Sequence, residues 1–256
     1  MRIVGVIPSR WASTRLPGKS LIPLCGKPLV QWVVERARQA TQIHHLMVAT
    51  DDVRIRDALG PLGVDTVLTA SHHPSGTDRI AEALQGREVD IVVNIQGDEP
   101  LVDPALIDRL ALELVRDSAW DMATVATPLT EPGDLNSRSV TKVVWSQSGQ
   151  ALYFSRAAIP CLRDPDRKPP GLTYFRHVGL YAYRKAFLDR MVLAPPCVME
   201  LAEGLEQLRA LDLGARIKVI EAPYEGLGVD VPEDVPRAEA ALKRAGLARS
   251  NHAANG

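Results

Sequence analysis

An alternation of short apolar runs with helical patterns constrains the fold of this chain more than any other feature. Strands separated by helices of about ten residues indicate βαβ units and a mostly parallel sheet with helices on both faces. In such sheets ligands bind beyond the carboxyl ends of the strands, so we expect a site at that edge. Strands are predicted at 2–7, 45–50, 66–68 and 91–95, and helices at 28–37, 55–62, 75–85 and 104–115.

The middle of the chain has a different pattern. Strands are predicted there at 123–128, 140–145, 151–154 and 175–183, with no long helix between them. We interpret residues 123–183 as an antiparallel insertion within one α/β domain spanning residues 1–256. The pattern after it predicts a helix over 201–213, a strand at 217–222 and a helix at 232–245.

Composition excludes several classes of protein. A formal net charge of -1 gives no overall basic field for nucleic acid, so an anionic ligand would need a local cluster of Arg and Lys. Cys25, Cys161 and Cys197 are far apart and lack metal-site spacing, which indicates neither zinc nor a disulfide framework. No apolar run approaches the roughly 20 residues that span a bilayer. We expect a soluble, cytoplasmic protein with no membrane insertion.

A basic loop follows the first predicted strand. It combines three cations, Arg10, Arg15 and Lys19, with the hydroxyls of Ser9, Ser13 and Thr14. Arginine offers forked donors and lysine a point charge, so such a loop can wrap a triphosphate. Composition alone also allows a solvated basic loop.

Two aspartates come after strand-like segments, each preceded by a glycine. Asp98 follows the apolar run at 91–95, and Asp230 follows a shorter one. Carboxylates at strand ends suit Mg2+, which takes one or two protein carboxylates together with phosphate oxygens. The alternative is that both aspartates cap turns or helices.

The order of these motifs resembles the 3-deoxy-manno-octulosonate (Kdo) cytidylyltransferases, the CMP-Kdo synthetase family, over nearly the whole chain. Residues 10–19 read R-x-x-S-T-R-L-P-x-K, and further family motifs follow in order at 26–29, 49–51, 75–79, 94–100, 151–160, 176–183, 205–209 and 228–234. The sequence departs at Cys161, where relatives often carry an aromatic residue, and in a short connection at 164–173. Both departures lie near the segments that would bind the sugar, and they leave the identity of the sugar open.

The resemblance implies a Rossmann-like nucleotide-diphospho-sugar transferase fold with a small antiparallel dimerisation insertion. It also implies an enzyme that transfers CMP from CTP to the anomeric hydroxyl of Kdo for lipopolysaccharide biosynthesis. Such an enzyme would use Mg2+, act as a homodimer and bind no nucleic acid.

Residue roles follow from the same resemblance. Asp98 and Asp230 would hold the metal and act in catalysis with Arg10, Arg15 and Lys19. Arg156 could neutralise the sugar carboxylate, and His177 and Tyr181 would face one side of a strand. The nucleotide-binding residues would be Pro8, Ser9, Arg10, Ser13, Arg15, Lys19, Ser75, Gly76, Arg79 and Gln96, and the sugar-binding residues Arg156, His177, Tyr181, Glu206 and Gln207.

Three alternatives remain open from the sequence. The same chemistry could serve 8-amino-Kdo or a sialic-type acid. A glycosyltransferase would need an Asp-x-Asp metal motif, which Asp51-Asp52 and Asp98-Glu99 match only loosely. A non-catalytic nucleotide-binding regulator would bind CTP without turnover.

Overall fold

The computed structural model describes residues 1–13, 15–164, 166–224 and 226–248. The chain forms two compact units. The N-terminal unit contains residues 3–88 and 94–108 with the segment from 225 onward, and the central unit contains residues 1–2, 89–93 and 109–224. Strand β6 (Ile91–Asn94) and helix α4 (Pro104–Arg116) each contribute residues to both units.

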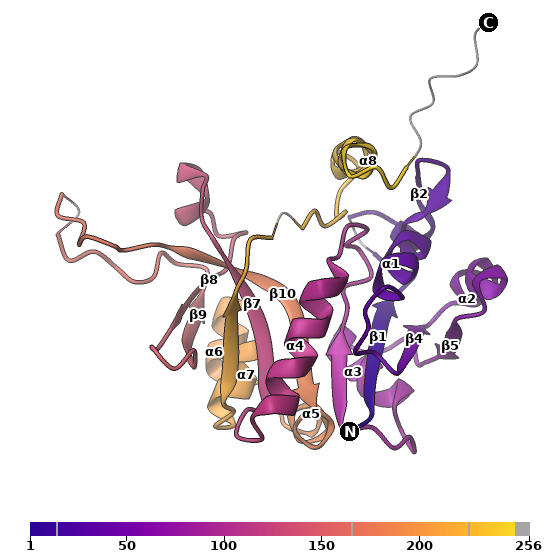
Figure 1. Cartoon of the computed structure of the whole chain (residues 1–256), viewed down its shortest axis with the longest axis horizontal. Coiled ribbons are helices and arrows are strands. Elements are labelled where there is room, and N and C mark those ends of the chain that lie inside the picture. The colour runs from indigo at the N-terminus through magenta and orange to yellow at the C-terminus, as the bar shows by residue number, and fades with distance from the viewer. Residues whose placement is uncertain (14, 165, 225, 249–256) are drawn as a thin grey trace, which may run out of the picture. The chain divides into compact units, whose positions relative to one another are not determined.

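The N-terminal unit is built on parallel strands. Its other elements are β1 (Ile3–Ser9), η1 (Lys19–Leu21), β2 (Pro23–Leu24), β3 (Lys27–Pro28), α1 (Leu29–Ala37), β4 (His45–Thr50), α2 (Val53–Leu59), η2 (Gly60–Leu62), β5 (Asp65–Leu68), α3 (Gly76–Ala83) and α8 (Asp234–Arg244). β1 pairs in parallel with β4, and β4 pairs in parallel with β5 (Figure 1). All residues from Ile3 to Ile7 are buried, so both faces of β1 are covered, as its continuous apolar run predicts.

A core cluster in this unit fixes the segment before Asp230. Val229 is fully buried together with Leu29 of α1 and Leu242 of α8. The backbone N–H of Val229 also donates a 2.9 Å hydrogen bond to the carbonyl oxygen of Asp98. Apolar burial and this one backbone bond therefore bring two distant aspartates into the same region.

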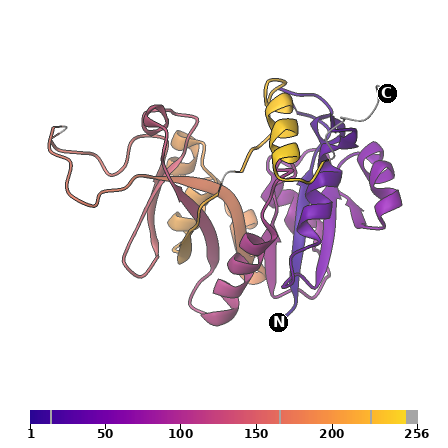
Figure 2. The same cartoon turned by 45° about the horizontal axis from the view of Figure 1, so that its top comes forward.

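The central unit mixes antiparallel and parallel pairing. Its elements are β7 (Met122–Pro128), η3 (Pro132–Leu135), β8 (Lys142–Trp145), β9 (Ala151–Ser155), β10 (Phe175–Arg184), α5 (Lys185–Leu193), α6 (Val198–Glu203), α7 (Gln207–Asp212) and β11 (Ile217–Glu221). β7 pairs antiparallel with β10 and parallel with β11, while β8 and β9 form an antiparallel pair (Figure 2).

The prediction of a mostly parallel sheet with helices on both faces is confirmed, and the strands predicted between 123 and 183 are present.

The predicted single helix over 201–213 is wrong. Gly204 adopts the left-handed conformation (φ 61°) and ends α6, and α7 begins only at Gln207. Glu206 is therefore the N-cap residue of α7 and not a residue within a helix. Leucines continue at helical spacing across this break, which is why periodicity alone did not reveal it.

The structure differs from the prediction at the start of two further helices. Helix α3 begins at Gly76, one residue after the predicted start, because Ser75 is its N-cap and its Oγ accepts a 3.2 Å hydrogen bond from the backbone N–H of Asp78. Helix α5 was not predicted, although Phe187, Leu188 and Met191 are buried at helical spacing. It follows β10 directly, without turn residues that would have marked its start.

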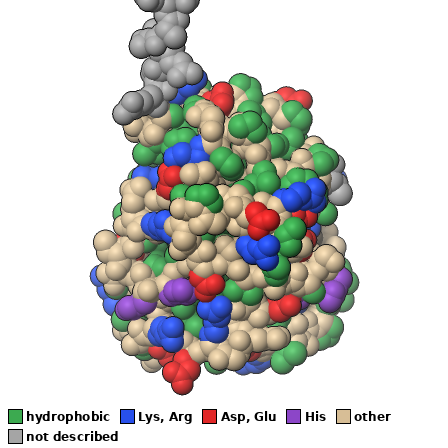
Figure 3. Space-filling model, turned by 90° about the vertical axis from the view of Figure 1, so that its right-hand side faces the viewer, with side chains coloured by type: hydrophobic (Ala, Val, Ile, Leu, Met, Phe, Trp, Pro, Cys, Tyr) green, Lys and Arg blue, Asp and Glu red, His purple; other side chains and the backbone are tan. Residues whose placement is uncertain are grey.

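The structure contains no helix, within the described residues, that is long and apolar enough to cross a membrane. Figure 3 shows basic and acidic side chains interspersed over one face, with no continuous patch of one sign there. This distribution agrees with the near-zero net charge.

Candidate active site

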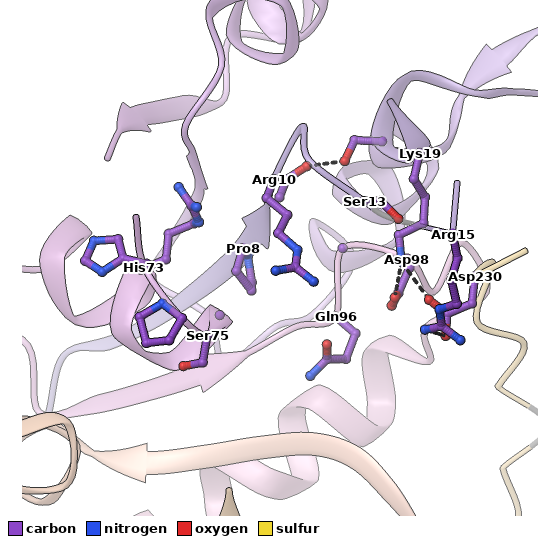
Figure 4. Close-up of a pocket in the computed structure, with 16 residues that line it drawn as sticks. Pro8, Arg10, Ser13, Arg15, Lys19, His73, Ser75, Gln96, Asp98 and Asp230 are labelled. Atoms are coloured by element: carbon purple, nitrogen blue, oxygen red, sulfur yellow. Dashed lines mark hydrogen bonds and ion pairs between the residues drawn. The ribbon is translucent and has the colours of Figure 1, made fainter. Parts of the chain in front are cut away.

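A cavity of about 440 Å³ opens in the N-terminal unit. It is lined by the end of β1 and the loop after it, by the start of α3 and the residues just before it, by the segment after β6 and by Asp230 (Figure 4). The cavity contains every residue predicted to bind the nucleotide or the metal: Pro8, Ser9, Arg10, Ser13, Arg15, Lys19, Ser75, Gly76, Arg79, Gln96, Asp98 and Asp230. The prediction did not include four other lining residues: Ser20, His73, Pro74 and Gly97.

Two glycines allow three segments to meet at Pro8. A Cβ on Gly97 would lie 2.5 Å from the carbonyl oxygen of Pro8, closer than two such atoms can approach. A Cβ on Gly76 would lie 3.3 Å from Pro8 Cγ. The absence of side chains at these glycines lets the start of α3 and the turn after β6 pack directly against the end of β1.

Trp11 organises the basic loop. Its carbonyl oxygen accepts hydrogen bonds from the backbone N–H groups of Ser13 (2.9 Å) and Gly18 (3.3 Å). The guanidinium carbon of Arg54 lies 3.4 Å from the centroid of its ring. These contacts fold the loop back on itself. Thr14, predicted as one of its hydroxyls, lies outside the described residues.

Asp51 joins this loop to α3. Its Oδ1 accepts a 2.9 Å hydrogen bond from the backbone N–H of Trp11, and its Oδ2 lies 3.1 Å from the guanidinium of Arg79. The side chains of Asp51 and Arg79 are only 7% and 3% exposed, so the ion pair is buried. The prediction gave Asp51 no role in the site, although it directly follows a predicted strand within the Ala-Thr-Asp segment.

Lys19 lies between the two predicted metal ligands. Its Nζ is 2.7 Å from Asp98 Oδ2 and 3.0 Å from Asp230 Oδ1. Burial opposes ionisation of Lys19, but the two carboxylates outweigh it and raise the pKa of the ammonium. Burial likewise opposes ionisation of Asp230, but Lys19 and Arg15 outweigh it and lower the pKa of that carboxyl. Both shifts favour the charged forms of Lys19 and Asp230.

Positive charge exceeds negative charge at this end of the cavity. Arg15 pairs with Asp230 at 3.1 Å, whereas Arg10 is exposed and has no ion pair among the described residues. Figure 4 shows Arg10, Arg15 and Lys19 extending into the space that Asp98 and Asp230 also face. Three cations against two carboxylates leave a net charge suited to an anion such as a triphosphate.

His73 occupies the other end of the cavity. Its Nε2 is hydrogen-bonded to Glu82 Oε2, and Glu82 also accepts a 2.9 Å hydrogen bond from the backbone N–H of Ala70. The hydrogen bond from His73 lowers the pKa of the Glu82 carboxyl. The sequence signal for His73 is its place two residues before Ser75, in the same strand-to-helix connection.

The five predicted sugar-binding residues lie in the central unit, and two of them are neighbours there. The rings of His177 and Tyr181 are 5.3 Å apart between centroids. Burial, with the charges of Tyr183 and Glu206, raises the pKa of Tyr181 well above its usual value. Gln207, at the start of α7, is 4% exposed.

Arg156 is bound to backbone carbonyls. Its Nε donates to the carbonyl oxygen of Glu203 at 2.6 Å, and its two terminal nitrogens donate to those of Arg138 (2.8 Å) and Gly204 (3.3 Å). The guanidinium therefore satisfies the C-terminal carbonyls of α6. Its predicted role toward a sugar carboxylate stays a prediction.

A basic loop and a pair of carboxylates lie beyond the ends of parallel strands. This arrangement is typical of sites that bind nucleotides. The family model described as Cytidylyltransferase matches residues 4–217, so the fold and site define this chain as a nucleotidyltransferase of the cytidylyltransferase class. A 4-diphosphocytidyl-2C-methyl-D-erythritol synthase from Anaerococcus prevotii shares this fold at 15% identity, with a TM-score of 0.61 and coverage of 95% of this chain and 99% of that one.

More similar relatives define the family further. The chain is 47% identical to a 3-deoxy-manno-octulosonate cytidylyltransferase from Bdellovibrio bacteriovorus, over 96% of this chain and 100% of the relative. It is 43% identical to one from Trichlorobacter lovleyi, over 95% and 100%. A structure of CMP:2-keto-3-deoxy-manno-octonic acid synthetase complexed with CTP matches with a TM-score of 0.90 and 38% identity, covering 96% of this chain and 100% of that one. The chain belongs to the 3-deoxy-manno-octulosonate cytidylyltransferase family, as its motifs predicted.

Proposed function

We propose that this protein transfers CMP from CTP to the anomeric hydroxyl of Kdo and releases pyrophosphate. The observation that carries this proposal is the meeting of three cations and two carboxylates in one cavity beyond parallel strands. The relatives' names support the cytidine nucleotide and the acid sugar.

The reaction is a displacement at phosphorus. The anomeric oxygen forms a bond to the α-phosphorus, the bond from that phosphorus to the bridging oxygen breaks, and pyrophosphate leaves while the proton of the hydroxyl passes to solvent. Arg10, Arg15 and Lys19 would bind the β- and γ-phosphates and stabilise the charge of the leaving group. Because no covalent enzyme intermediate is required, the chain mainly positions the two reactants.

The paired carboxylates fit a magnesium ion. Asp98 and Asp230 already converge on a cation, the ammonium of Lys19. The described residues contain no cluster of three or more His, Cys, Asp or Glu side chains that could hold a metal. Two protein carboxylates with substrate oxygens are a usual Mg2+ environment. When bound, Mg2+ supplies charge neutralisation at the phosphates and activation of the hydroxyl.

The central unit would bind the acid sugar. A polyhydroxylated ligand needs both donors and acceptors, and His177, Tyr181, Glu206 and Gln207 provide both. Arg156 would add a positive charge toward the carboxylate.

A homodimer is the assembly we propose. Four large apolar side chains between residues 152 and 201 of the central unit are more than half exposed, which favours their burial against a second copy of the chain: Leu152 (59%), Leu193 (85%), Val198 (83%) and Leu201 (71%). Sedimentation of the purified protein as a monomer would contradict this assembly. The product would serve lipopolysaccharide assembly from the cytoplasm.

The decisive experiment measures pyrophosphate release from purified protein with CTP, Mg2+ and Kdo. Parallel reactions would omit the sugar, replace Kdo with 8-amino-Kdo or sialic acid, or add EDTA. Release that needs both Kdo and metal would support the reaction and the sugar. Release only with another acid sugar would replace the substrate, and no release with any sugar would contradict the proposed enzyme activity.

A further inference from the structure

Thr124 is a fully buried residue of β7 whose hydroxyl contacts three groups of β10. Its Oγ1 lies 2.9 Å from the carbonyl oxygen of Leu180 and 3.3 Å from that of Val178. It also lies 2.9 Å from Nε2 of His177. No role in a site was predicted for this threonine.

An irregularity in β10 creates this arrangement. The register with β7 shifts between Val178 and Tyr181, so that Tyr181 lies opposite Thr124 and His177 lies opposite Ala126. Residues opposite one another in an antiparallel pair share a face of the sheet. Thr124, His177 and Tyr181 are therefore on one face, and the bulge turns two carbonyl groups toward the threonine hydroxyl.

The hydrogen-bond partners of Thr124 decide where its proton goes. A hydroxyl has one proton to donate and two lone pairs that accept. Carbonyl oxygens can only accept, so the Thr124 proton is directed to them, with Leu180 the nearer. Toward His177, Oγ1 can then only accept, and Nε2 must carry the hydrogen.

The tautomer of His177 follows from this. Burial lowers the pKa of His177 to about 3, so the ring is neutral at neutral pH and has a single N–H. With the hydrogen on Nε2, Nδ1 has a lone pair. Within the part of the chain that the structure describes, Thr124 is the one hydrogen-bond partner of this ring. Nδ1 is thus left as an acceptor on a ring whose centroid lies 5.3 Å from that of Tyr181.

We propose that Thr124 is a positioning residue for the sugar: it holds His177 as the Nε2–H tautomer, so that Nδ1 accepts a hydrogen bond from a sugar hydroxyl. The identity of the ligand rests on the proposed function, whereas the tautomer does not. In the other tautomer Nδ1 would carry the hydrogen and could not accept a hydrogen bond from a sugar hydroxyl. Nε2 would then be an acceptor facing Oγ1, in addition to the two carbonyl oxygens.

The test begins with the ligand-free wild-type protein. Nitrogen and carbon NMR shifts of the His177 ring, assigned by comparison with His177→Gln, should report hydrogen on Nε2. This measurement needs no variant of Thr124. Hydrogen on Nδ1 would overturn the proposal.

Two substitutions then test the consequence. Thr124→Val keeps the shape but removes the hydroxyl, so the ring should lose its Nε2–H preference and the KM for Kdo should rise about tenfold, with the KM for CTP unchanged. Thr124→Ser should restore both the tautomer and the KM. The matched control is Thr127→Val, another buried threonine of β7, whose Oγ1 accepts from the backbone N–H of Tyr224.

The results of these experiments distinguish the role of Thr124 from the proposed enzyme activity. A Thr124→Val protein with an unchanged tautomer and an unchanged KM for Kdo would overturn the role of Thr124. Wild-type protein with hydrogen on Nε2 but no turnover with any acid sugar would contradict the proposed function while supporting the tautomer.

Discussion

The ammonium of Lys19 lies 2.7 Å from Asp98 and occupies the point on which the two predicted metal carboxylates converge. A divalent cation bound by these two carboxylates would therefore compete with Lys19 for Asp98 Oδ2 and Asp230 Oδ1. Lys19 belongs to the loop that would bind the triphosphate, so its release from Asp98 would make its charge available to the nucleotide.

Lys19→Met should increase the affinity for Mn2+ in the absence of nucleotide by about tenfold, because the carboxylates lose their internal cation. The same variant should lose turnover, because a positive charge at the phosphates is gone. Mn2+ titration followed by electron paramagnetic resonance measures the affinity. Lys27→Met, which removes a lysine paired with Glu35 in the same unit, is the control. Equal Mn2+ affinity in wild type and Lys19→Met would contradict this competition.

Asp98→Asn should reduce kcat by at least about a hundredfold while leaving the thermal unfolding temperature nearly unchanged. The amide keeps the size of the side chain but removes a charged ligand. Steady-state pyrophosphate release gives kcat, and Asp57→Asn provides an exposed aspartate as control. Activity close to wild type would show that Asp98 is not a metal ligand.

Asp51→Ala should lower the free energy of unfolding by about 3–5 kcal/mol, because Arg79 would remain buried without its partner. Asp51→Asn should lower the free energy of unfolding by less, since an amide oxygen can still accept a hydrogen bond from the backbone N–H of Trp11. It should nevertheless raise the KM for CTP. Urea denaturation and CTP titrations measure the two effects. A small stability change in Asp51→Ala would mean that water or another group replaces the carboxylate.

Gly97→Ala should lower stability by about 1–3 kcal/mol and weaken CTP binding, because the new Cβ would overlap the carbonyl oxygen of Pro8. Gly60→Ala adds the same methyl group where no atom lies within 4 Å, so it should change neither property. Thermal unfolding and CTP binding by calorimetry compare the two variants. Similar results for both would place Gly97 outside the tightly packed contact.

Acid should destabilise the protein through His177. Its folded pKa of about 3 lies below the usual value near 6.5, so between these values the unfolded state binds more protons than the folded state. Stability should therefore fall as pH decreases from about 6.5 toward 3, by up to about 1.4 kcal/mol per pH unit from this group. His177→Gln should reduce that slope in urea denaturation at several pH values. An identical slope would show that other groups control acid unfolding.

Most helices and strands of residues 3–116 were predictable, because each depends on a local pattern. β4 begins and ends where its apolar run predicts, and α4 is one residue longer than expected. The central unit was less predictable, because its breaks depend on backbone conformation. Gly204 interrupts an otherwise helical run of apolar residues, and nothing in the spacing of the leucines marks that interruption.

The sequence by itself determined which segments carry the candidate nucleotide and metal site, because motif order and residue chemistry are local properties. Only the tertiary structure decided how those residues are paired. Lys19 meets Asp230 across 211 positions, and Thr124 meets His177 across 53. Such contacts arise from the register of strands and the burial of Val229, and neither is encoded in any single segment. A buried charge or proton takes its state from the groups around it, so the roles of Asp51 and Thr124 became visible only once the chain was folded.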